Sequence, residues 1–362
     1  MTQMETGRAT TAKLLRPYTR PLIKNAWYVA GWSADFGEDL LARRILDEPI
    51  LFYRASTGEP VAVLDICPHK LAPMRLGQRI GDDVQCGYHG LKFNKLGQCV
   101  HNPQGNGIIP ANARLKSYPT HERYGAVWIW MGDPDKANPD AIPDFSVLDD
   151  PKYKSVRGGH KVESNYMMMV ENLLDLGHAL FLHANTAGMG NLQLTESKIT
   201  NEAGSIKDWR FYNNVPTPSL FSRFLNEERA DLWSDIRWSA PSVLLNHAGV
   251  APVGRPRDKA VAVEQFGTHF LTPETLTTTH YFYANARNYA LDDPAGDEAW
   301  RQWQRRALKE EDSMVAEAIQ GLVPQAEELG VEIVVLSTDL SAIRANRILE
   351  EMAAAEEMTA AG

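Results

Sequence analysis

The chain has 362 residues, of which 44% are hydrophobic and 23% charged, and its formal net charge is −9. At about 150 residues per domain, this length suggests two or three domains with enough apolar residues for buried cores. A net acidic chain lacks the broad basic surface that binds a phosphate backbone, which argues against a nucleic-acid partner. No apolar run is long enough for a transmembrane span, and no apolar signal-peptide core is present. Three cysteines are too few for a disulfide framework, so we expect a cytoplasmic protein that does not bind membranes.

Residues 25–135 predict a small, all-β domain. Short runs rich in β-branched and aromatic residues alternate there with Gly, Pro, Asp and Asn clusters, as is typical of strands and tight turns. Residues 1–24 lack this pattern, and we expect them to form an N-terminal tail. The stretch 133–143 is rich in Pro and Asp and marks the expected boundary, so that the second domain covers residues 136–362. The clearest strand candidates are residues 26–30, 50–53, 61–64 and 126–131.

Two short segments of this β domain each carry one cysteine and one histidine. They read Cys67-Pro-His69 and Cys86-Gly-Tyr-His89. Thiolate and imidazole ligands together bind either zinc or an iron–sulfur centre. Zinc modules usually separate paired ligands by at least two residues, and this spacing argues against zinc. Two similar Cys/His loops instead favour a Rieske [2Fe–2S] cluster, in which two imidazoles replace two thiolates and raise the potential. Cys99 lies outside both loops and is expected to be a free thiol.

Residues 136–362 mix helical and β-type patterns, which favours an α+β domain with an antiparallel sheet flanked by helices. Apolar spacing predicts one helix at residues 165–183 and a long one at about 297–329. The strand candidates of this domain are residues 208–212, 235–238, 242–245, 267–271 and 277–283.

The first of these predicted helices contains His178 and His183, five residues apart. On a regular helix they would point about 140° away from each other, so they can share a metal only if the helix loosens between them. Gly177 makes such a distortion inexpensive. A lone histidine here would be read as a hydrogen-bonded core residue. Combined with the Rieske signature, the pair indicates a 2-His-1-carboxylate iron site that leaves positions open for oxygen.

Asp312 is the candidate carboxylate of this site. On a regular helix it shares a face with the apolar residues four positions before it and three and seven positions after it. An unpaired charge on an apolar face is costly, and a metal would compensate it. The alternative is that Asp312 ends a solvated run of charges, which is what we expect of Glu310 and Glu311. The apolar residues are Leu308, Val315 and Ile319.

The sequence resembles the oxygenase components of the Rieske non-heme iron oxygenases, and among them the dealkylating monooxygenases typified by dicamba O-demethylase. The resemblance runs from residue 25 to about residue 348. It is carried by NAWYVA at 25–30, LDICPH at 64–69, GQCVHNPQGNG at 97–107, AIPDF at 141–145, DLGHA at 175–179, DIRW at 235–238, GTHFLTPET at 267–275 and RQWQ at 301–304.

This resemblance implies a fold and two iron-containing cofactors. The fold is an N-terminal Rieske domain followed by a catalytic domain of the helix-grip, START-like type. The cofactors are a [2Fe–2S] cluster and a mononuclear Fe(II), with O2 as co-substrate. The implied cluster ligands are Cys67, His69, Cys86 and His89, and the implied iron ligands are His178, His183 and Asp312.

Further positions match residues near the iron and the substrate. Asp175 matches a carboxylate that links a cluster-ligand histidine of one subunit to an iron-ligand histidine of the next, and Asn172 matches an asparagine near the iron. The alternative for Asp175 is a cap or salt bridge within its own domain. The family also implies a head-to-tail homotrimer. The implied substrate contacts are Asn246 and His269 to a carboxylate and Trp303 to the ring, while Ser234 stands where the dicamba enzyme has an asparagine.

The implied activity is that of a terminal oxygenase that hydroxylates an alkyl carbon next to O or N of an aromatic substrate and so releases an aldehyde. No dinucleotide or P-loop fingerprint occurs, so the electrons must come from ferredoxin and ferredoxin reductase partners, and ultimately from NAD(P)H. O-demethylation of a methoxybenzoate-like acid competes with N-dealkylation of a neutral chloroacetanilide-type amide and with cis-dihydroxylation. A Rieske electron carrier without oxygenase activity and a structural zinc protein are the alternatives from other classes.

Overall fold

The computed structural model describes residues 22–184, 186 and 192–361. The expected N-terminal tail therefore lies almost entirely outside the described residues. The chain forms two compact units, one of residues 24–143 with 272–275 and the other of residues 144–271 with those from 276 onward. The predicted domain limits at residues 135 and 136 stay predictions. Among the described residues, no helix is both long and apolar enough to cross a membrane.

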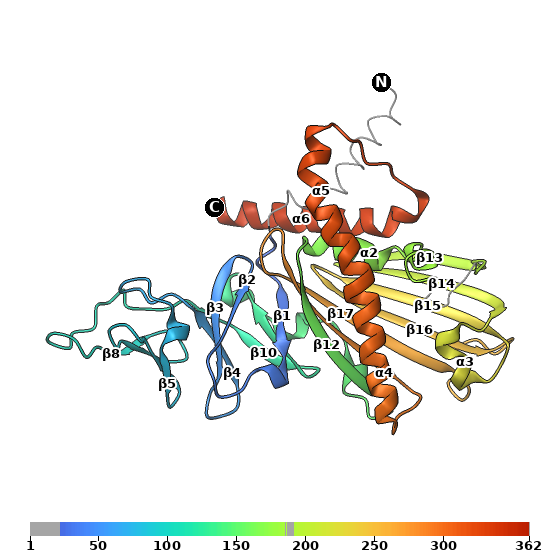
Figure 1. The fold of residues 1–362 in the computed structure, drawn as a ribbon. Coiled ribbons are helices and arrows are strands. Elements are labelled where there is room, and N and C mark those ends of the chain that lie inside the picture. Colours follow the sequence, from blue (N-terminus) through green and yellow to red (C-terminus); the bar gives the residue numbers. More distant parts are fainter. Residues whose placement is uncertain (1–21, 185, 187–191, 362) are drawn as a thin grey trace. The chain divides into compact units, whose positions relative to one another are not determined.

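The first unit is all-β (Figure 1). Its strands are β1 (Trp27–Trp32), β2 (Leu41–Ile45), β3 (Glu48–Arg54), β4 (Pro60–Leu64), β5 (Gln78–Ile80), β6 (Asp83–Gln85), β7 (Lys92–Phe93), β8 (Cys99–His101), β9 (Ser117–Tyr118), β10 (Thr120–Arg123) and β11 (Ala126–Trp130). They form three sheets with the orders β1-β11-β10, β2-β3-β4-β9 and β5-β6-β7-β8. All four runs predicted as strands are strands.

One hydrophobic core of this unit joins the sheets to the two Cys/His loops. Leu51 and Tyr53 of β3 and Val63 of β4 pack in the same cluster as Cys67 and Cys86. The cysteines are 1% and 2% exposed. The β-branched and aromatic strand residues thus hold the two cysteines in place, because a close-packed core resists displacement of either one.

The second unit contains one seven-stranded sheet of order β12-β18-β17-β16-β15-β14-β13. Its strands are β12 (Lys154–Val162), β13 (Glu196–Glu202), β14 (Ser205–Pro216), β15 (Arg229–Ser239), β16 (Val243–Pro252), β17 (Val263–Pro273) and β18 (Thr279–Arg287). Adjacent long strands are antiparallel, so alternate residues of several strands share one face. This arrangement confirms the α+β prediction.

The second unit also contains helices (Figure 1). They are α2 (Tyr166–Leu174), α3 (Ser219–Leu225), α4 (Pro294–Gln304), a π-helix (Arg305–Ser313), α5 (Met314–Glu328) and α6 (Leu340–Ala361), with a 3₁₀ turn at His178–Leu180. α4 lies beside β12, whereas α6 packs on β14 and α2.

Two predicted helices need correction. The helix expected at residues 165–183 ends at Leu174, and the one expected at 297–329 is interrupted by nine residues of π-helix. Each departure lies where predicted metal ligands lie. π-helical turns inside α-helices are rare and frequently mark functional sites.

Candidate functional site

The two Cys/His loops of the first unit have the same backbone hydrogen bonds. In each, the N–H of Cys67 or Cys86 donates to the carbonyl five residues later, with N···O distances of 2.9 and 2.8 Å. In each, the residue four positions after the cysteine donates back to its carbonyl at 3.0 Å. Those residues, Leu71 and Gly90, both have positive φ, of 56° and 79°. The sequence therefore builds one tight turn twice.

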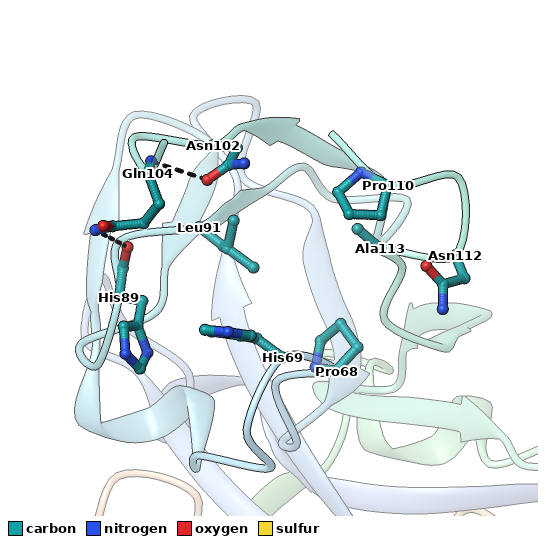
Figure 2. A pocket seen from close by; sticks show the side chains of 9 residues that line it. All are labelled: Pro68, His69, His89, Leu91, Asn102, Gln104, Pro110, Asn112 and Ala113. Carbon is teal, nitrogen blue, oxygen red and sulfur yellow. Dashed lines mark hydrogen bonds between the residues drawn. The ribbon is translucent and has the colours of Figure 1, made fainter. Parts of the chain in front are cut away.

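These turns place the cysteines inside and the histidines outward. The rings of His69 and His89 lie with their centroids 4.5 Å apart, at one pocket of about 310 Å³ (Figure 2). The Nδ1 atom of His89 is buried and has no hydrogen-bond partner among the described residues. A buried nitrogen without a partner is costly unless a bound metal accepts its lone pair.

The Cys67 sulfur would need a bound cation to become a thiolate. Burial raises the pKa of the Cys67 thiol to about 11; backbone N–H groups of His69 and Lys70 oppose this shift, while the adjacent Cys86 adds to it. A metal would hold both sulfurs as thiolates. Two buried sulfurs, N–H groups directed at one of them and an orphan imidazole nitrogen fit a [2Fe–2S] cluster of the Rieske type.

The second constellation forms where α2 ends. The N–H of Asp175 closes the last helical turn, and the chain then enters the 3₁₀ turn that carries His178. The loosening expected between His178 and His183 is instead an end of the helix before both histidines, at Leu174. Because of it, the two imidazoles point toward each other, with their Nε2 atoms 3.3 Å apart.

Asp312 completes this group from the π-helix. Its Oδ1 atom lies 3.0 Å from Nε2 of His183 and 3.5 Å from Nε2 of His178. Metal–ligand bonds of about 2.1 Å at right angles place donor atoms about 3 Å apart, which is close to these separations. Asp312 is 2% exposed, and its pKa is lowered to about 2 because hydrogen bonds and charges of the two histidines outweigh the effect of burial. The three residues fit a divalent iron.

Hydrogen bonds on the far side of each ring orient the lone pairs. Nδ1 of His178 contacts the backbone carbonyl of Asp175, which can only accept, so this nitrogen carries the proton. Nδ1 of His183 lies 2.7 Å from Oε2 of Glu311. With Nδ1 holding a proton in both rings, each Nε2 can lose its N–H contact to Asp312 and offer its lone pair to a metal bound between the three side chains.

The surroundings of Asp312 differ from the predicted helical face. Leu308 is buried, but Ile319 is 50% exposed. The prediction assumed α-helical spacing, and the π-helix shifts that register. Burial of Asp312 therefore comes from the residues it contacts across the fold and not from an apolar stripe on its own helix.

A cavity of about 350 Å³ opens beside these donors, within the range of small-molecule sites. It lies between one face of the sheet and the residues of α2, α3, α4 and the π-helix. All four residues predicted to contact substrate line it together with His178, His183 and Asp312. They are Ser234 of β15, Asn246 of β16, His269 of β17 and Trp303 of α4.

Two side chains in this cavity are fixed as hydrogen-bond donors. The Ser234 hydroxyl donates to Oδ1 of Asn246 at 3.0 Å, which leaves the Asn246 amide N–H groups free of that bond. Nδ1 of His269 lies 2.6 Å from the hydroxyl of Tyr281. Burial raises the pKa of Tyr281 well above its ordinary value and lowers that of His269 to about 4. Tyr281 thus donates to Nδ1, and Nε2–H of the neutral imidazole remains as a donor.

The remaining predicted residues lie near the iron donors. The Asn172 amide donates to Oδ1 of Asp312 at 3.4 Å. One carboxylate oxygen of Asp175 accepts the N–H of Gly177 at 2.8 Å. Asp175 directly follows the end of α2 and His178 begins the next 3₁₀ turn, so the two residues share no helix.

Two family models match the chain. Residues 26–119 match the Rieske [2Fe-2S] domain, and residues 162–355 match the vanillate O-demethylase oxygenase C-terminal domain. The oxygenase component of dicamba O-demethylase from Stenotrophomonas maltophilia is 42% identical over 91% of this chain and 97% of its own length. The chain belongs to the Rieske non-heme iron oxygenases.

Two further comparisons support this assignment. The oxygenase component of chloroacetanilide N-alkylformylase from Rhizorhabdus wittichii is 33% identical over 92% of this chain and 96% of its own length. A crystal structure of dicamba monooxygenase with non-heme iron and dicamba has a TM-score of 0.84 and 40% identity, and covers 94% of this chain and 100% of that one. This Rieske oxygenase is an O2-dependent oxidoreductase of the monooxygenase type and not a pure electron carrier.

Sequence reasoning misjudged one residue of this Rieske oxygenase. Glu311 was expected to be solvated, but its side chain is 16% exposed and contacts His183. The structural reason is the π-helix, which lets consecutive residues 311 and 312 both reach inward. The one signal in the sequence was the position of this acid immediately before the candidate ligand.

The buried neutral state of His269 predicts a pH-dependent stability. Its folded pKa of about 4 lies below the ordinary 6.5, so only the unfolded chain gains a proton as pH falls between these values. The His269 contribution is therefore fully present above pH 6.5 and declines toward pH 4. Between pH 7.5 and pH 5, the unfolding free energy of the native protein should fall. We expect the fall to be about 2 kcal/mol smaller in His269→Gln, which lacks this imidazole. Urea unfolding measures this difference. Equal losses in both proteins would contradict it, and exposed His101→Gln is the control.

Proposed function

We propose that this chain is the terminal oxygenase of a multicomponent system that oxidatively dealkylates a small anionic aromatic molecule, with an aryl methyl ether as the favoured substrate. The observation that carries this proposal is the shared cavity. On its sheet side, N–H donors of Asn246 and His269 suit an anionic group. On its helical side, the three donor atoms of the candidate iron site lie at its wall.

The apolar residues of the cavity support an aromatic substrate. Trp303 presents an aromatic surface and is itself held by Trp300, with ring centroids 5.1 Å apart. Leu173, Leu232 and Phe221 line the same space. Aromatic rings pack well on such surfaces, and the apolar lining excludes water from the reacting carbon. A ring held at one end by its anionic group places its other substituents toward the iron donors.

The chemistry divides between cofactors and protein. When bound, a Rieske cluster held by Cys67, His69, Cys86 and His89 and an iron held by His178, His183 and Asp312 would supply single electrons and activation of O2. An aryl methyl ether, O2, two electrons and two protons give the phenol, formaldehyde and water. The hydroxylated carbon forms a hemiacetal, whose C–O bond to the ring oxygen breaks. The protein's own residues orient the methyl group and exclude water.

The electrons would come from ferredoxin and ferredoxin reductase partners that draw on NAD(P)H. We further propose a head-to-tail homotrimer, in which the route between the two metal centres runs between subunits. A heterologous interface that closes on itself produces such a ring. Asp175 supports this arrangement, because one of its oxygens is held by Gly177 and its backbone carbonyl orients His178, so its second oxygen remains for His89 of the partner subunit.

A panel of substrates tests the activity. With a surrogate ferredoxin and reductase, we expect turnover of methoxybenzoates to exceed that of neutral alkoxyalkyl chloroacetanilides. His269→Ala should raise KM for the acid by about tenfold, the value of one or two lost hydrogen bonds to a charge. Preferred turnover of the neutral amides would establish the N-dealkylase alternative instead. An unchanged KM for every substrate would exclude His269 as a substrate contact.

The two metal centres should be separable. Cys86→Ala removes a cluster ligand, so we expect loss of the visible absorption of the cluster while the second unit stays folded. His183→Ala removes an iron ligand, so we expect the colour to remain while turnover falls by more than the about 10- to 100-fold that loss of a ligand's outer partner typically costs. Absorption spectra, iron assay and turnover distinguish these outcomes. A His183→Ala protein that selectively lost its colour would contradict the assignment.

Asp175→Asn tests the inter-subunit route. The amide preserves the size of the carboxylate but weakens its hydrogen bond to an imidazole, so both metals and the trimer should remain while electron transfer slows by about 100-fold. Light scattering and stopped-flow oxidation of the reduced cluster measure these properties. An active monomer at working concentration would exclude the route between subunits.

A further inference from the structure

Glu311 has contacts that the proposed function does not use. One carboxylate oxygen, Oε2, lies 2.7 Å from Nδ1 of His183. The other, Oε1, accepts hydrogen bonds from the hydroxyl of Thr186 and from Nε of Arg306. Both oxygens of Glu311 are thus engaged, Oε2 toward His183 and Oε1 toward Thr186 and Arg306.

The neighbouring Glu310 provides a natural comparison. Its side chain is 55% exposed and pairs with Arg305 on the surface. Glu311 is 16% exposed and faces the iron donors. Two adjacent glutamates of the same π-helix therefore have different surroundings, which makes Glu310 a matched control for charge and helix position.

Thr186 extends the contacts of Glu311 to the wall of the substrate cavity. Its hydroxyl donates to Glu311, while its backbone carbonyl accepts the indole N–H of Trp303 at 3.0 Å. Trp303 lines the cavity. A continuous chain of hydrogen bonds thus runs from Trp303 through Thr186 and Glu311 to the ring of His183.

We propose that Glu311 is a positioning residue that couples the substrate-cavity wall to the orientation of His183. This inference rests on the proposed role of His183 as an iron ligand. A substrate ring that presses on Trp303 acts on Thr186, and Thr186 shares its carboxylate partner with His183. Occupancy of the cavity is thereby transmitted to the lone pair that faces the iron.

Loss of Glu311 should affect the iron before it affects the fold. The carboxylate fixes both the proton on Nδ1 and the rotation of the ring, and removal of such an outer partner typically costs about 10- to 100-fold in metal affinity. Thr186→Val removes the hydrogen bond from Thr186 to Glu311 but leaves the contact between Glu311 and His183. Iron affinity should therefore stay within about threefold of the native value. The substrate response should be lost in both variants.

The experiment uses the holoenzyme and has two readouts besides turnover. Competition with a chelator gives the affinity of the mononuclear site for Fe(II) alone, and the electron paramagnetic resonance signal of the nitric oxide adduct reports the symmetry at the iron with and without dicamba. We compare Glu311→Ala, Glu311→Gln, Thr186→Val and Glu310→Gln with the native protein. Cluster absorption and melting temperature confirm that each variant is folded, and Glu311→Gln keeps the test open if the alanine variant does not fold.

We expect both Glu311 variants to weaken Fe(II) binding, with alanine the more severe, and Glu310→Gln to have no effect. We expect dicamba to change the signal of the native protein and of Glu310→Gln, but not that of Thr186→Val or the Glu311 variants. Native affinity in Glu311→Ala, or a native substrate response in Thr186→Val, would overturn the inference. Failure of the proposed iron site itself would look different, since His183→Ala would then bind Fe(II) as the native protein does.

Discussion

Burial of the Asp312 carboxylate is the constraint on which the catalytic unit depends. A charge that is 2% exposed is stable only if other groups compensate it. The compensation comes from His178 and His183, which reach Asp312 because α2 ends at Leu174. It also requires the π-helix, which turns Asp312 inward. The two irregularities of the backbone together bring these three side chains to one place.

The sequence predicted the chemistry of the site better than its local geometry. The cysteines and histidines of the first unit could be identified because ligand type and spacing are visible along the chain. His178 and His183 could be paired only by assuming that the helix between them is distorted. In the structure the helix instead ends before both histidines, at Leu174, a position that no residue pattern marks unambiguously.

Other features could not be read from the chain because they depend on contacts distant in sequence. No residue pattern in the sequence marks the π-helix. The predicted apolar face therefore assumed regular α-helical spacing and wrongly included Ile319. Glu311 resembles its solvated neighbour until the fold brings Thr186 and His183 to it. The last helix, α6, follows an Ala- and Glu-rich pattern without a strong apolar face, and its place against α2 and β14 is set by tertiary packing.

The division of labour within the cavity has a consequence for the evolution of substrate choice. The iron donors come from helical and turn segments, whereas Ser234, Asn246 and His269 stand on three neighbouring strands of the sheet. A strand position can change its side chain while the ladder of main-chain hydrogen bonds stays intact. New substrates can therefore be accommodated by substitutions on one face of the sheet, while the iron-binding residues stay unchanged. The Ser234–Asn246 pair is one such exchangeable element, because a single hydroxyl there decides which way the amide points.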